Sequence, residues 1–332
     1  MLNLFFILSE LHNAAYANEI SRELAYTGAT RYTDAEDIFI GYETAPVAEA
    51  FVDAYRLQGI PEALMRGKYE KLQAIADRNA AIGAGLDIYA DVMTTGVHRS
   101  LFDNALFLIL TESILFAILT ALYSLGYEHQ NKTEMVVYGT KTGRHIALHK
   151  KAAALTAAAC GFALIAAFTL AIYFAVWDFS GFWNANVSGM MNYIVDEAGF
   201  RPFITWVSLT VAEYLAAVLA LSFSLTLVFS LIGSLAGLLA RNTYIGFMAV
   251  ILLCMLMMVS VYFFRGIGFG WGAIVSLFSP VAVWYSHDRW LTDMGSFGYI
   301  PFHETVAILG NFVLFALFAF LATRRFLRKD VL

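Results

Sequence analysis

Two carboxylates lie inside long apolar stretches of this sequence, Glu112 and Glu213. A charge near the centre of a bilayer costs about 2.5–3.5 kcal/mol on insertion scales, so such residues usually face a bundle interior or a water-filled path. Two further groups suited to acid–base chemistry, His287 and Asp288, are adjacent nearer the C-terminus. The four side chains indicate either a solute pathway through Glu112 and Glu213 or an intramembrane enzyme acting at the outer face. The alternative is an interfacial Glu213 and a neutral, hydrogen-bonded Glu112.

A basic segment, residues 126–151, separates two of the apolar stretches. Its middle carries a short apolar patch made of Met135, Val136, Val137 and Tyr138. The cations that flank the patch are Lys132, Lys141, Arg144, Lys150 and Lys151. The patch is too short to cross a bilayer but suits a groove on a partner, and the flanking cations can contact acidic protein surface or lipid headgroups. The alternative is a loop whose positive charges only set the topology.

Other chemistry is largely excluded by the motifs. The chain has no GxxxxGK[ST] loop to hold ATP phosphates, and its alternating glycines from Gly266 do not form GxGxxG. His145 and His149 stand four residues apart, but no HExxH accompanies them, so we interpret them as solvated loop residues. Cys160 and Cys254 both lie in apolar runs. We therefore expect no catalytic residues, no metal site and no cofactor in this chain, and no nucleic-acid partner.

Membrane helices must position these groups. The 332 residues are 60% hydrophobic and only 14% charged, whereas soluble domains are nearer half apolar and a quarter charged. Several apolar runs approach the ~20 residues that a helix needs to cross a bilayer. We predict an all-α, polytopic membrane protein with five transmembrane helices, at about Ala105–Leu125, Ala152–Trp177, Phe203–Ala240, Tyr244–Phe264 and Val306–Thr323.

Two stretches make this count debatable. Phe203–Ala240 is long enough for two tight spans, but no turn residue interrupts it before Gly233, so we predict one tilted or extended helix. Gly266–Ser286 is apolar but contains alternating glycines and Pro280, which weaken a continuous helix. Broken, re-entrant helices before the last span fit it better, provided that protein covers their free backbone groups.

The charges of the connections predict the orientation. Lys and Arg are concentrated in residues 126–151, in the short link at 241–243 and in the C-terminal tail. Arg201 is the one basic residue in 178–202, where three acidic residues oppose it. Cytoplasmic loops are enriched in Lys and Arg, so a five-span arrangement with the C-terminus inside places every basic connection inside and every acidic one outside.

Residues 1–104 form a different region, with fifteen Asp and Glu against eight Lys and Arg. Pro46 and Pro61 each stand at a predicted first helical turn, and apolar residues then recur every three or four positions. We predict an extracytoplasmic helical domain here and a transmembrane domain over 105–332. We interpret Leu2–Leu8 as the outer end of a further span that precedes this sequence; the alternative is a cleaved signal sequence.

The order of a span, an outer helical domain, a second span and a basic inner loop resembles permeases of the type-2 export class of ABC transporters. The loop "KTEMVVYGTKTGRHIALHKKAAAL" is similar to their coupling helix and the turn that leads into the next span, and the glycine-broken connection at 265–305 looks like their re-entrant helices. The resemblance implies a bacterial cell-membrane exporter subunit that couples through residues 132–151.

The same resemblance implies its partners. These are an ATP-binding subunit that carries ATP and Mg, a second permease that is identical or related, and the lipid bilayer. The rivals are the intramembrane enzyme, with Glu112, Glu213, His287 and Asp288 as its acid–base groups, and a membrane sensor or scaffold that detects ligands through the outer helices. The sequence names no cargo.

Overall fold

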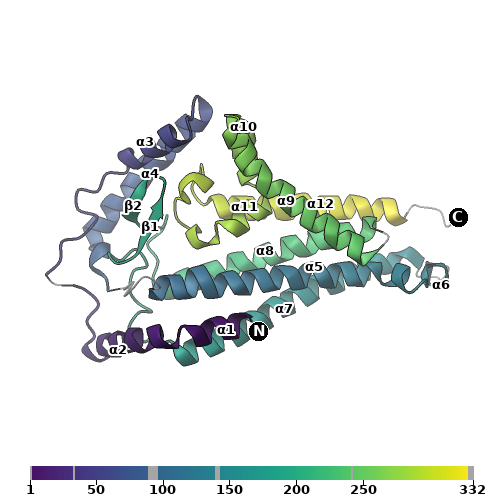
Figure 1. Ribbon diagram of the computed structural model, residues 1–332, viewed down its shortest axis with the longest axis horizontal. Coiled ribbons are helices and arrows are strands. Elements are labelled where there is room, and N and C mark those ends of the chain that lie inside the picture. Colours follow the sequence, from purple (N-terminus) through teal and green to yellow (C-terminus); the bar gives the residue numbers. More distant parts are fainter. Residues whose placement is uncertain (1, 33, 89–95, 139–142, 241, 328–332) are drawn as a thin grey trace.

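The computed structural model describes residues 2–32, 34–88, 96–138, 143–240 and 242–327. Helices dominate these residues (Figure 1). The helices are α1 (Leu2–Ser9), α2 (Leu11–Thr27), α3 (Ala45–Ala54), α4 (Ile60–Ile82), α5 (Leu106–Gln130), α6 (Glu134–Tyr138), α7 (Ile146–Val176), α8 (Val211–Leu239), α9 (Thr243–Gly266), α10 (Gly270–Leu277), α11 (Pro280–Tyr285) and α12 (His303–Leu327). Strands β1 (Tyr193–Asp196) and β2 (Gly199–Pro202) form an antiparallel hairpin.

Five helices are long and apolar enough to cross a membrane: α5 with the turn before it, α7, α8, α9 and α12. The prediction of an all-α polytopic membrane protein is confirmed. Helix α8 is central, because it contacts each of the other four. By contrast, most of α9 is exposed. Its apolar side chains suit a lipid environment.

The predicted spans are present, but their ends differ from the prediction. The stretch that begins at Phe203 contains one helix, as expected, yet α8 starts only at Val211. Thr210 and Glu213 form a capping box that fixes this start. The residues before it are held in extended structure, where the Trp206 N–H donates to the Leu291 carbonyl. Helix α7 has 31 residues, about 46 Å at 1.5 Å per residue, so it exceeds a bilayer core of ~30 Å.

The region Gly266–Ser286 is broken, as the glycines and Pro280 predict. Gly268 has a φ of 69°, a left-handed conformation that ends one helix before α10 begins. Ser279 caps α11, and Pro280 occupies its first turn. Helix α10 contacts α9, and α11 contacts both α9 and α12. Their depth relative to a bilayer stays a prediction.

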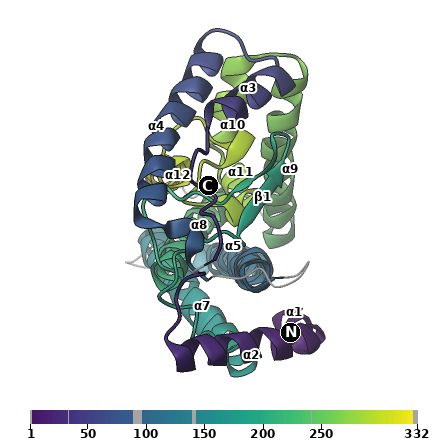
Figure 2. The same ribbon diagram turned by 90° about the vertical axis from the view of Figure 1, so that its left-hand side faces the viewer.

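The two ends of the bundle differ. Helices α3 and α4 and the hairpin gather at one end, which we call the α4 end; α6 lies at the other, the α6 end, with the C-terminal end of α12 (Figure 1). Helices α1 and α2 lie beside α7 rather than with α3 and α4 (Figure 2). At the α4 end, α3 and α4 pack together with the hairpin and residues 286–302. The structural unit at this end therefore includes residues from outside 1–104. The hairpin was not predicted.

A π-helical segment, η2 (Arg99–Ala105), leads into α5. The Leu106 N–H donates to the Leu101 carbonyl, five residues back, instead of the usual four. Segments of this kind are rare and occur frequently at functional sites. This one turns Asp103 toward the residues that follow α11, because the Asp103 carbonyl accepts a hydrogen bond from His287 Nε2 at 3.1 Å.

Close contact between α5 and α8 depends on Gly233. A Cβ there would lie 3.0 Å from both the Cα and the carbonyl oxygen of Ile118, which are backbone atoms that cannot move aside. We predict that Gly233→Ala destabilises the protein by about 1–3 kcal/mol through overpacking. Gly310→Ala in α12 is the control, since no atom lies within 4 Å of its added Cβ. Thermal unfolding of the purified variants in detergent measures both, and equal melting temperatures would contradict the close approach.

Candidate functional site

A buried lysine joins α4 to the turn before α12. Lys68 is 1% exposed, and its Nζ donates to the carbonyls of Asp293, Gly295 and Gly298 at 3.1, 2.8 and 2.8 Å. An ammonium group has three N–H donors, so the three carbonyls satisfy it fully. The sequence supplies the position, because Lys68 follows Leu64 and precedes Leu72 by one helical turn each and therefore shares their buried face.

An arginine from the hairpin completes this charged cluster. Arg201 on β2 donates to both oxygens of Asp293, at 2.9 and 2.8 Å, and to Asp196 Oδ2 at 2.7 Å. The hydroxyl of Tyr69, next to Lys68, also donates to Asp293. Lys68, Arg201, Asp196 and Asp293 carry two charges of each sign, so their formal charges cancel.

Burial and charge set the protonation of this cluster in opposite ways. Burial lowers the pKa of Lys68 to about 7, while Asp293 and the three carbonyls favour its charged form. Burial opposes ionisation of Asp293, but the charges of Arg201 and Lys68 outweigh it and lower the pKa of that carboxyl. Arg201 and Asp293 therefore form an ionised pair in a water-poor setting, where removal of one partner is costly.

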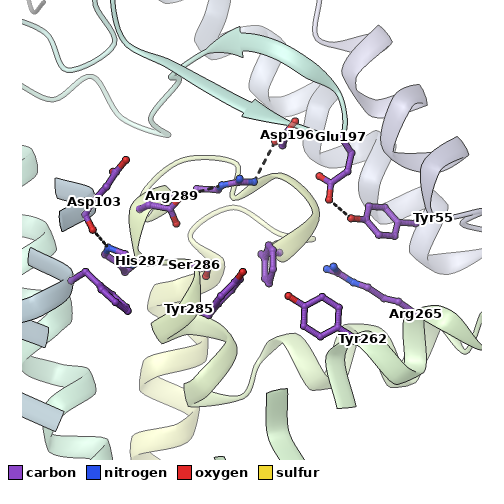
Figure 3. Close-up of a pocket in the computed structure, with 13 residues that line it drawn as sticks. Tyr55, Asp103, Asp196, Glu197, Tyr262, Arg265, Tyr285, Ser286, His287 and Arg289 are labelled. Carbon is purple, nitrogen blue, oxygen red and sulfur yellow. Dashed lines mark hydrogen bonds and ion pairs between the residues drawn. The ribbon is translucent and has the colours of Figure 1, made fainter. Parts of the chain in front are cut away.

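A cavity of about 670 Å³ lies beside this cluster, where the ends of α3, α9 and α11 meet the hairpin and η2 (Figure 3). It is lined by Tyr55, Asp103, Phe107, Asp196, Glu197, Tyr262, Arg265, Tyr285, Ser286, His287, Asp288, Arg289 and Phe297. A second cavity of about 330 Å³ shares Asp103, Asp288 and Arg289 with it and adds Arg99. The volume of the larger cavity is typical of small-molecule sites, and its lining combines five aromatic rings with six charged residues.

Arg265 and Glu197 stand on one wall of the larger cavity. The Arg265 guanidinium lies 4.9 Å from the ring centre of Tyr55 and 5.0 Å from that of Phe297, and it donates to the Ser296 carbonyl. The Tyr55 hydroxyl donates to Glu197. Burial opposes ionisation of Glu197, but this hydrogen bond and two nearby arginines outweigh it and lower the pKa of the carboxyl. This wall of the cavity therefore presents charges of both signs held in defined positions.

His287 and Asp288 stand on the opposite wall. His287 is 8% exposed and burial lowers its pKa, so the ring is neutral near pH 7. Because a carbonyl can only accept, the bond to Asp103 places the proton on Nε2. Nδ1 is then an acceptor, and it has no hydrogen-bond partner among the described residues. The Asp288 side chain is 36% exposed, and Arg289 Nε is 3.4 Å from its carboxylate.

The structure does not bring Glu112 and Glu213 into this cavity. Asn3 Nδ2 donates to Glu112 Oε2 at 3.1 Å and to Thr169 Oγ1 at 3.0 Å, so the amide links α1, α5 and α7. Glu213 Oε2 accepts from the Thr210 N–H at 2.9 Å within the capping box. No contact among the described residues joins the two glutamates, and a pathway role for them stays a prediction.

The predicted coupling patch lies at the α6 end, on α6 itself. Met135 and Val136 are 70% and 74% exposed. Val137 is half-buried. The backbones of Tyr138 and Arg144 belong to α6 and to η3 (Gly143–His145), but their side chains, like all of Lys141, lie outside the described residues.

Lys150, one of the cations of the basic segment, lies in the first turns of α7. It forms an ion pair with the buried Glu128 and donates to the Ser124 carbonyl at 2.7 Å, so it ties the start of α7 to the end of α5.

Sequence reasoning missed Lys68, Arg201, Asp293 and Arg265. Two signals point to them: Lys68 interrupts an apolar helical stripe, and Arg201 stands alone in an acidic connection. Neither signal names the partner, since Lys68 and Asp293 are 225 residues apart.

The chain matches no model of a known protein family, no curated protein and no solved structure.

We predict that Asp293→Asn lowers the free energy of unfolding by about 3–5 kcal/mol, because it leaves Arg201 and Lys68 buried with too little negative charge. Asp178→Asn is the control. Its ion pair with Arg22 lies at the surface, with the Asp178 side chain 28% and the Arg22 side chain 72% accessible, so the change should stay within about 1 kcal/mol. Thermal unfolding of the purified proteins measures both, and similar shifts for the two variants would contradict a structural role for the cluster.

Proposed function

We propose that this protein is the permease subunit of an ATP-driven exporter in the bacterial cell membrane. It pairs with a second permease and with a separate ATP-binding subunit, and α6 is the helix that couples to that subunit. Movement of the ATP-binding subunits would switch the pathway between inward and outward access. The observation that carries the proposal is α6, which presents two exposed apolar side chains at the end of two long membrane helices.

The positions of α5 and α7 support this role. Helix α7 is longer than a bilayer core is thick, so a part of it projects beyond the membrane. At the α6 end, the Glu128–Lys150 pair joins the two helices directly beside the loop. The patch at Met135 and Val136 therefore lies next to two helices that are joined by an ion pair. A displacement of α6 would act on both helices. Exposed apolar side chains in water mark interaction sites.

The connection charges support an orientation with the α6 end inside and the α4 end outside. We predict that a cysteine replacing Asp77, which is exposed on α4, reacts with a membrane-impermeant maleimide on whole cells. A cysteine replacing the exposed His145 should react only after the membrane is permeabilised. Both variants are made in a background without Cys160 and Cys254. Labelling at position 145 on intact cells would reverse the orientation and remove the basis for coupling to cytoplasmic ATPases.

Val136→Asp should disrupt coupling, because burying an unpaired charge in the contact costs several kcal/mol. Each ~1.4 kcal/mol is tenfold in affinity, so association with the proposed ATP-binding subunit should fall at least about tenfold. Membrane abundance should be unchanged, since Val136 is 74% exposed. Copurification and ATP hydrolysis of the complex are the measurements.

The matched control is Ile40→Asp, which places the same charge at a residue 73% exposed on the α4-end unit. Its copurification and ATP hydrolysis should equal those of the unchanged protein. If Val136→Asp also retains full association and transport, α6 is not the coupling helix and the basic loop only sets topology.

A further inference from the structure

We propose that the cavity at the α4 end binds a zwitterion: a small molecule that carries one ammonium and one anionic group on an apolar or aromatic body. The inference goes beyond the proposed function, because this binding needs no ATP-binding subunit. It rests on which hydrogen-bonding groups of the cavity walls remain unused, on the charge balance of the two linings, and on the rings between them.

One wall offers unused acceptors. His287 lines this wall, but its Nδ1 is buried, so the acceptor that faces the cavity is the partly exposed carboxylate of Asp288. Asp288 follows His287 directly in the chain. A carboxylate has about four lone-pair sites, and among the described residues Asp288 pairs with Arg289 alone. An ammonium group supplies N–H donors for this carboxylate, so it fits this wall.

The opposite wall offers unused donors. A guanidinium has five N–H donors. Among the described residues Arg265 donates one hydrogen bond, to the Ser296 carbonyl, so further donors are available to a ligand. The rings of Tyr55 and Phe297 hold the guanidinium from the side. Figure 3 shows Arg265 across the cavity from His287, with Tyr285 between them and Tyr262 beside Arg265. A carboxylate or phosphate fits Arg265, and the rings suit an apolar body.

The charge balance explains why one ligand should carry both signs. Asp196 belongs to the neutral cluster with Arg201, Lys68 and Asp293. The remaining charged groups of the two linings are three carboxylates and three guanidiniums: Asp103, Glu197 and Asp288, and Arg99, Arg265 and Arg289. A ligand with net charge would leave this balance uncompensated in a partly dry site, whereas a zwitterion preserves it.

The test uses the dipeptide Phe-Phe, its N-acetylated form, which is only anionic, and its C-terminal amide, which is only cationic. Calorimetry on the purified chain in detergent should show Phe-Phe binding at least about tenfold tighter than either derivative. Asp288→Asn should weaken Phe-Phe and the amide but not the acetylated form. Arg265→Gln should weaken Phe-Phe and the acetylated form but not the amide. A misfolded variant cannot give this crossed pattern, because it would lose all three ligands.

Asp53→Asn is the matched control, since Asp53 is exposed on α3 and does not line either cavity. Equal binding of the three peptides, or an equal loss for Asp53→Asn and Asp288→Asn, would overturn the proposal. Repeating the titration in nanodiscs distinguishes two sources of the zwitterion. Weaker Phe-Phe binding in phosphatidylethanolamine than in phosphatidylglycerol supports a lipid headgroup, and equal binding supports a soluble ligand.

Discussion

The α4 end depends on the buried contact between Arg201 and Asp293. It joins the hairpin to the turn before α12, and Lys68 adds α4 through three carbonyls of the same turn. The space is so tight that a Cβ at Gly295 would lie 2.9 Å from Asp196 Oδ2, and the residue has a φ of 53°. Both facts require glycine. Buried charged groups tolerate little displacement, so the contacts of Arg201 with Asp293 and Asp196 fix the side of the cavity that Asp196 lines.

The cavity wall on the membrane side comes from the bundle itself. Asp103 belongs to η2, and His287 reaches its carbonyl from the turn after α11. The π-helical turn at the start of α5 therefore holds the Asp103 carbonyl within hydrogen-bond distance of His287. Helix α5 continues from η2 to the α6 end, so the two ends of the molecule share one continuous helix.

Helix α8 makes that connection stiff. Gly233 and Gly237 let it approach α5 closely, and a Cβ at Gly237 would lie 3.0 Å from Leu125 Cβ. Near this crossing the Glu128–Lys150 pair ties α5 to α7. A displacement of α6 would therefore be transmitted to α5 and α7, which pack against each other and are joined by this ion pair. The proposed coupling at one end and the proposed ligand site at the other would then be parts of one mechanism.

The sequence by itself determined the membrane class, the five helices and the break at Gly266–Ser286, because apolar length and helix-breaking residues act locally. The short apolar patch between cations, which the family resemblance matched to a coupling helix, is helical as α6, and its coupling role stays a proposal. Only the tertiary structure decided the cavity and its cluster. Lys68, Arg201 and Asp293 meet across 92 to 225 residues, and a lone charge in a sequence does not name its partner. The hairpin escaped prediction for the same reason: its short strands are set in place by Arg201 and not by their own periodicity.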